Sequence, residues 1–207
     1  GFLVTGARAE VLQFETLNIR PYGIESRDGF LSGNLYEIAN AIAAEADIEI
    51  DNSLVPLARV IKHIQKNKPI CTIVIRSEYS SKISIPVADI HIDLFAGIIA
   101  RRGIKLKNYD DLDGLIIALA RGTYIEHRFD SDENLQKHFV EGDLQAVKML
   151  QKKRVDAIAG GLSALKFNMK SIGMPLDSTE KPLILVKRPF WLHCAKSLQN
   201  GNLLDRL

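Results

Sequence analysis

Between Arg20 and Arg76 the sequence alternates short apolar runs with amphipathic segments, and this alternation constrains the fold more than any other feature. Continuous apolar runs of strand length, such as Cys71–Ile75, are typical of strands covered on both faces of a mainly parallel sheet. Apolar residues at helical spacing follow Asn34 and again follow Pro56. The order strand, helix, strand, helix, strand predicts an open α/β unit with right-handed crossovers.

Local signals predict where the elements of this first part begin. We expect a strand within Leu3–Leu17 and a helix from Asn34, with Glu37 three residues on as its capping-box partner. A short strand is expected at Ile48–Ile50, and Pro56 is expected as the first residue of the next helix.

The rest of the chain predicts a second α/β unit. We expect Ile90–Ala100 to carry the chain into it. The further expected elements are a strand at Leu115–Ala120, a helix opened by a Thr123–Glu126 capping box, a helix capped by Asp143, a strand at Arg154–Ala159 broken by Gly160 and Gly161, a helix at Leu162–Ser171, and return strands at Leu183–Lys187 and Phe190–Cys194. Lobe 1 is therefore expected to comprise residues 1–91 and 189–207, and lobe 2 residues 92–188.

Composition excludes several classes of protein. With 207 residues, 46% of them hydrophobic and 25% charged, the chain is typical of a globular protein. The net charge of +2, without a basic run, argues against nucleic-acid binding, and no apolar stretch is long enough to predict a membrane span. Cys71 and Cys194 are either two buried thiols or one disulfide. The histidines lack the spacing of a metal site, so neither a metal nor a cofactor is expected.

Five blocks in order resemble the extracellular solute-binding protein family 3, which has the type II periplasmic-binding fold. The blocks are Pro21-Tyr22-Gly23 with Asp28-Gly29, Val55–Arg59, Lys82–Pro86, Asp110–Gly114 with Gly122-Thr123-Tyr124, and Leu150 with Arg154–Ala157. The resemblance implies a two-lobed α/β fold in which each lobe is an open, mostly parallel sheet flanked by helices. It also implies that a small solute is captured in the cleft between the lobes.

Two departures mark the chain as a divergent member of that resemblance. The block in which the family carries an arginine for the ligand carboxylate reads Ser77–Lys82 here and contains no arginine. The position at which the family holds the ligand ammonium with an acidic residue is Gly161. The expected ligand is therefore a small polar, anionic solute other than a standard amino acid, with Arg76 or Arg59 as the replacement cation.

Three side chains of the first lobe are candidate ligand contacts. Arg76 ends an apolar strand, where its guanidinium offers a planar fork to a carboxylate, and the alternative is an ion pair with Glu78. Arg59 lies in the first turn of a helix, where the macrodipole disfavours a cation, so either a ligand or a nearby carboxylate is expected beside it. Tyr22 follows a strand at a turn, where it either closes over a ligand or packs in the core.

The second lobe offers backbone groups. Gly122, Thr123 and Tyr124 are expected at a helix N-terminus after a strand, where unpaired N–H groups form an anion site, and the alternative is ordinary capping by Thr123. Gly161 has the same expected geometry, with a plain turn as its alternative.

The first functional hypothesis is a monomeric periplasmic or extracytoplasmic binding protein that delivers its solute to the membrane permease of an ABC-type transporter. The first alternative is the ligand-sensing domain of a membrane receptor. Another is an enzyme on the same fold, of the dehydratase or lytic transglycosylase type, with Glu78 or Glu126 as general acid. The last alternative is a non-binding structural remnant of the fold. No catalytic residue is assigned.

Overall fold

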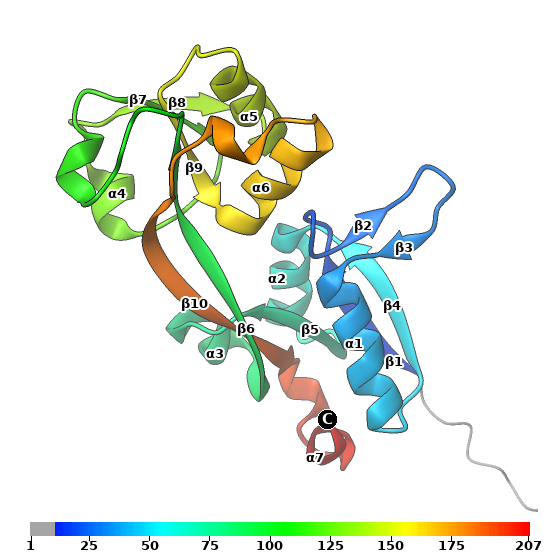
Figure 1. Ribbon diagram of the computed structural model, residues 1–207. Helices are drawn as coiled ribbons and strands as arrows, with labels where there is room; N and C mark the ends of the chain where they lie inside the picture. Colours follow the sequence, from blue (N-terminus) through cyan, green and yellow to red (C-terminus); the bar gives the residue numbers. More distant parts are fainter. Residues whose placement is uncertain (1–10) are drawn as a thin grey trace, which may run out of the picture. The chain divides into compact units, whose positions relative to one another are not determined.

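The computed structural model describes residues 11–207, which divide into two compact units (Figure 1). Unit 1 comprises the described residues up to Ile92 together with Pro189–Leu207, and unit 2 comprises Asp93–Arg188. The beginning of the expected strand Leu3–Leu17 lies outside the described residues.

The sheet of unit 1 has the strand order β4-β1-β5-β10. Its strands are β1 (Leu12–Leu17), β4 (Ile50–Val55), β5 (Ile70–Ile75) and β10 (Leu183–Cys194). The first three run parallel, and β10 runs antiparallel to β5. All residues of β5 except the last are buried, as its continuous apolar run predicts.

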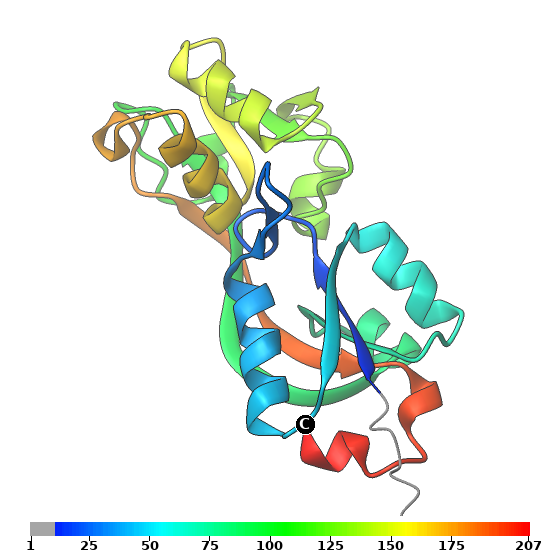
Figure 2. The same cartoon turned by 90° about the vertical axis from the view of Figure 1, so that its right-hand side faces the viewer.

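Two helices cover opposite faces of this sheet (Figure 2). Helix α1 (Asn34–Glu45) buries Leu35, Ala39 and Ala43, and helix α2 (Leu57–Gln65) buries Val60 and Ile64. Small alanines in the first helix allow close packing against the strands. The smaller elements of unit 1 are β2 (Ile24–Glu25), β3 (Leu31–Ser32), α3 (Glu78–Ile83), a 3₁₀ turn (Lys196–Leu198) and α7 (Leu203–Arg206).

Three local predictions for unit 1 are wrong. Helix α1 has Gly33 as its N-cap and no side-chain cap bond, because the carbonyls of Pro21 and Tyr22 accept hydrogen bonds from its first amides. The second strand is β4 rather than Ile48–Ile50, since its polar residues are tolerated at the edge of the sheet. Pro56 precedes α2 as its N-cap.

The sheet of unit 2 has the order β6-β9-β7-β8. Its strands are β6 (Ile85–Ala100, which begins in unit 1), β7 (Ile116–Ala120), β8 (Gln136–Val140) and β9 (Ala157–Gly161). β7, β8 and β9 are parallel, and β6 is antiparallel to β9. The helices are α4 (His127–Ser131), α5 (Asp143–Gln151) and α6 (Leu162–Ser171), with 3₁₀ turns at Tyr109–Leu112 and Leu176–Ser178.

Alternation along the strands builds two cores in unit 2. Ala118 and Ile158 pack in the core covered by α5 and α6. Ile117 and Leu119 pack in the other core, with Phe129 of α4. Both faces of this sheet are therefore apolar, as expected for parallel strands with helices on both sides.

Several predictions for unit 2 are corrected. Gly160 and Gly161 continue β9 and pair with β6 instead of breaking the strand, and β10 is one strand across Pro189 rather than two. Helix α5 begins after Gly142 without a side-chain cap from Asp143. Strand β8 was not predicted at all, because an edge strand with mostly polar residues resembles a loop in sequence.

Strands β6 and β10 contribute residues to both units. They are neighbours in the full strand order, which reads β4-β1-β5-β10-β6-β9-β7-β8. Among residues 11–207, no helix combines the length and the apolar character that crossing a membrane requires.

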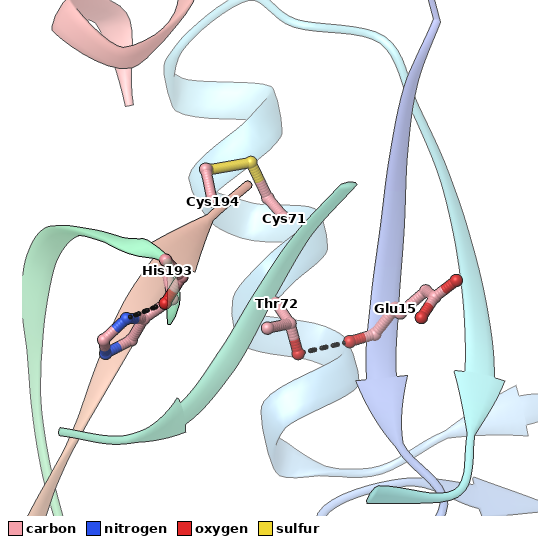
Figure 3. The surroundings of a disulfide bond; sticks show 6 residues. Glu15, Cys71, Thr72, His193 and Cys194 are labelled. Carbon is pink, nitrogen blue, oxygen red and sulfur yellow. Dashed lines mark hydrogen bonds between the residues drawn. A yellow bond between two sulfur atoms is a disulfide. The ribbon is translucent and has the colours of Figure 1, made fainter. Parts of the chain in front are cut away.

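The two cysteines form a disulfide bond (Figure 3). Cys71 on β5 and Cys194 on β10 are direct cross-strand partners, and both are fully buried. The structure thereby decides between the two alternatives that the sequence left open, and the bond joins the last strand of unit 1 to the centre of its sheet.

Candidate functional site

Three parallel strands of unit 1 end at one edge of its sheet. The carboxyl ends of β1 and β4 lie side by side: the Asn18 N–H, just after β1, donates a hydrogen bond of 3.0 Å to the carbonyl of Val55, the last residue of β4. Ligands of open α/β sheets bind outside the carboxyl ends of the strands. The candidates Tyr22, Arg59 and Arg76 all follow such strand ends, so the structure places them at one edge of unit 1.

Arg59 and Arg76 are both exposed cations at this edge. Arg59 lies in the first turn of α2, after β4, and its side chain has no acidic partner among the ion pairs of the described residues. Arg76 directly follows β5, and its own N–H donates to the Pro189 carbonyl at 2.9 Å. Two positive charges without described counter-charges make this edge suited to an anion.

Arg76 stacks on an aromatic ring with which no local sequence pattern associates it. Its guanidinium carbon Cζ lies 3.9 Å from the centroid of the Trp191 ring. The expected alternative, an ion pair with Glu78, is absent from residues 11–207. Trp191 was missed because it comes from the return strand, and only the register of β10 against β5 brings the two together.

Tyr22 is buried and packs in the core of unit 1. Its exposed fraction is 6%, and its ring meets that of Phe190 edge-on at a centroid distance of 5.2 Å. The Tyr22 carbonyl accepts hydrogen bonds from the Leu35 and Tyr36 N–H groups at the start of α1. This placement favours the packing alternative, although the ligand role of Tyr22 stays a prediction.

The carboxyl edge of the unit 2 sheet carries the other candidates. Gly122, Thr123 and Tyr124 follow β7 but form a turn, in which the Thr123 N–H donates to the Ala120 carbonyl at 3.1 Å. Helix α4 starts only at His127, so the expected helix N-terminus and Thr123 cap are wrong. The ligand role of these three residues stays a prediction, without the helix N-terminus from which it was inferred.

Tyr124 is nevertheless conspicuous, because 63% of it is exposed. The guanidinium carbon of Arg188, on β10, lies 5.8 Å from the centroid of its ring. Arg188 also donates to the Ile125 carbonyl at 3.0 Å, which ties the turn to the strand. Arg188 is a second residue, after Trp191, that sequence reasoning missed.

Gly161 is the last residue of β9 and the N-cap of α6. It lies at the same edge as the turn after β7, since β7 and β9 are parallel. Asp143, at the start of α5, lies nearby, with its Oδ1 atom 3.7 Å from where a Cβ on Gly160 would stand. Burial raises the pKa of the Asp143 carboxyl above its usual range.

The two acidic candidates lie in different units, Glu78 in unit 1 and Glu126 in unit 2. In the part of the chain that the structure covers, no group of three or more His, Cys, Asp or Glu residues is arranged to hold a metal ion. Glu78 is exposed in the first turn of α3, and Glu126 is the N-cap residue of α4 without a side-chain cap bond. The earlier explanation of Glu126 as a capping partner is therefore wrong.

Comparisons with known proteins identify similar structures but no related sequence family. No family model matches the chain, and no curated protein does. Among solved structures, a histidine kinase sensor domain with similarity to periplasmic binding proteins matches with a TM-score of 0.72 and 15% identity, over 95% of this chain and 86% of the other.

Two further structures are binding proteins. Holo ArgBP from T. maritima matches with a TM-score of 0.69 and 16% identity, over 96% of this chain and 87% of its own. The substrate-binding protein of an amino acid ABC transporter matches with a TM-score of 0.67 and 20% identity, over 95% and 88%. The expectation from the sequence is confirmed at the level of architecture: the chain has the α/β fold of the periplasmic binding proteins.

Proposed function

We propose that the protein binds a small polar solute carrying an anionic group. The observation that supports this most directly is the pair of exposed cations, Arg59 and Arg76, at the carboxyl ends of β4 and β5. This edge is where open α/β sheets hold their ligands, and guanidinium groups are well suited to carboxylates and phosphates. The contacts expected from Tyr22 and, in unit 2, from the residues Gly122, Thr123, Tyr124 and Gly161 remain part of the proposal.

We place this binding outside the cytoplasm. A buried structural disulfide such as Cys71–Cys194 persists in oxidising compartments and is rare in the cytosol. Similar structures include a transporter's substrate-binding protein and arginine-binding proteins, which supports delivery of the solute to a membrane permease. That the protein acts as a monomer stays a prediction from the sequence.

A second role has its own support. The solved structure with a TM-score of 0.72 is a histidine kinase sensor domain, so the same binding event would serve a membrane receptor. The two roles share the solute and differ in the membrane partner. An enzyme on this fold has weaker support, because the similar solved structures are a sensor domain and binding proteins.

A thermal-unfolding screen against carboxylates, phosphates and neutral polar solutes tests the proposal. A ligand present at about 100 times its Kd stabilises the folded protein by about 2.7 kcal/mol. We expect an anionic compound to raise the unfolding temperature in the wild type and Arg76→Ala to abolish most of that rise. If only neutral or cationic compounds stabilise the protein, or Arg76→Ala and Arg59→Ala both leave the rise unchanged, the anionic ligand is excluded.

A further inference from the structure

The contact between Arg76 and Trp191 is built by the register of two strands. Trp191 pairs directly with Val74, so Arg76, two residues further along the same face of β5, is its diagonal cross-strand neighbour. Diagonal neighbours in a sheet are within reach of aromatic and long side chains. The stacking distance of 3.9 Å between Cζ and the ring centroid follows from this register.

The backbone of both stacked residues is held in the sheet of unit 1. The Arg76 N–H donates to the Pro189 carbonyl at 2.9 Å, and Trp191 is half-buried between Phe190 and Leu192, which are both buried. The long arginine side chain, which would otherwise sample many rotamers, has one face of its guanidinium covered by the indole. This contact favours the rotamers of Arg76 that keep its guanidinium over the ring.

A guanidinium held in this way keeps its N–H donors available around its edge. Within residues 11–207, no oxygen accepts a hydrogen bond from the Arg76 side chain, and no carboxylate forms an ion pair with it. Five donors in a fixed fork match an acceptor with two oxygens in one plane. Both oxygens of a carboxylate can lie in the plane of the fork, whereas a sulfonate or phosphonate carries a third oxygen out of that plane.

We propose that Trp191 is a positioning residue that holds Arg76 for two-pronged recognition of a planar carboxylate on the solute. This inference rests on the proposed function and names its ligand class and its specificity-determining pair. Arg59, at the same edge of unit 1, has no aromatic partner among the cation–π contacts of the described chain.

The experiment uses Trp191 itself as the reporter, because it is the only tryptophan in the sequence. A library of mono-, di- and amino-carboxylic acids is titrated while tryptophan emission is recorded, and affinities are measured by calorimetry. Matched carboxylate and sulfonate pairs, such as L-aspartate with L-cysteate and β-alanine with taurine, measure the geometric preference. We expect a carboxylate to change the emission with the Kd that calorimetry gives, and to bind more tightly than its sulfonate partner.

Variants separate positioning from folding. Trp191→Ala and Arg76→Lys are each expected to weaken carboxylate binding by about 3- to 30-fold, the range of a partly desolvated cation–π contact. Both are also expected to lower the carboxylate-to-sulfonate preference, which a loss of stability alone would not change. Trp191→Phe is expected to restore most of the affinity. Arg128→Lys, which alters an exposed arginine stacked on Tyr109 away from the proposed site, is expected to leave the affinity and the preference unchanged.

The outcomes distinguish this inference from the function on which it rests. If a carboxylate binds but Trp191→Ala and Arg76→Lys both retain the affinity and the preference, the positioning role is wrong while the proposed function stands. If Trp191→Ala does not fold, Arg76→Lys and Trp191→Phe decide by the same two readouts. If no carboxylate binds the wild type while another anion does, the ligand class is wrong; if no anion binds, both proposals fall.

Discussion

At the scale of single residues, His193 of unit 1 is a buried ionisable side chain whose hydrogen-bonding capacity is only partly used. It is fully buried on β10, and its Nδ1 atom shares a hydrogen bond of 2.9 Å with the Ser84 hydroxyl (Figure 3). Its Nε2 atom has no hydrogen-bond partner among the described residues. Burial, and next the positive charge of Arg76, lower the pKa of His193 from 6.5 to about 4.

This lowered pKa predicts a pH dependence of stability. Between pH 6.5 and pH 4 the unfolded chain binds a proton at His193 that the folded protein does not bind, so stability is complete above pH 6.5 and falls as the pH falls. The loss approaches about 3 kcal/mol by pH 4. It is measured as the difference between urea unfolding of the wild type and of His193→Gln across this range. Parallel pH profiles for the two proteins would contradict the assignment.

At the scale of elements, the entry into α1 depends on one glycine. Gly33 has φ 120°, a conformation that other residues rarely adopt, and a Cβ there would lie within 3 Å of the Tyr22 carbonyl and of Gly23. The close approach exists because the Tyr22 carbonyl caps α1. The Asn34–Glu37 pattern therefore predicted the helix correctly, but the side-chain capping that it implied is replaced by capping from the backbone.

Replacing this glycine tests the capping by the backbone. Gly33→Ala combines a strained φ with a clash, so we expect a loss of more than about 2 kcal/mol in the free energy of unfolding. Gly29→Ala is the control, because Gly29 has φ 79° but open space around it, so strain acts there without a clash. Equal losses in the two variants, measured by chemical denaturation, would show that contact with Tyr22 is unimportant.

At the scale of the whole molecule, the disulfide secures the last strand of unit 1, whose partner β5 lies 123 residues earlier in the chain. Closing so long a loop removes much of the conformational entropy of the unfolded chain. We expect Cys71→Ala/Cys194→Ala to lose about 2–5 kcal/mol of stability. Urea unfolding with and without a reductant measures this, and a wild type insensitive to reductant in its unfolding midpoint would contradict a stabilising bond.

The sequence by itself determined the order of strands and helices and hence the fold. Apolar periodicity is local, so β5, β7 and α6 were predicted within one residue of their observed bounds. It also predicted Arg59 and Arg76 as candidate ligand contacts, because a cation in the first turn of a helix and a cation directly after a buried strand are both visible in one dimension.

Only the tertiary structure decided the rest. The disulfide and the stack of Arg76 on Trp191 depend on the register of β10 against β5, which no local pattern encodes. Strand β8 exists because β7 offers it an edge to pair with. In each case the energy comes from groups far apart in the chain, so the information appears only when the strands are assembled.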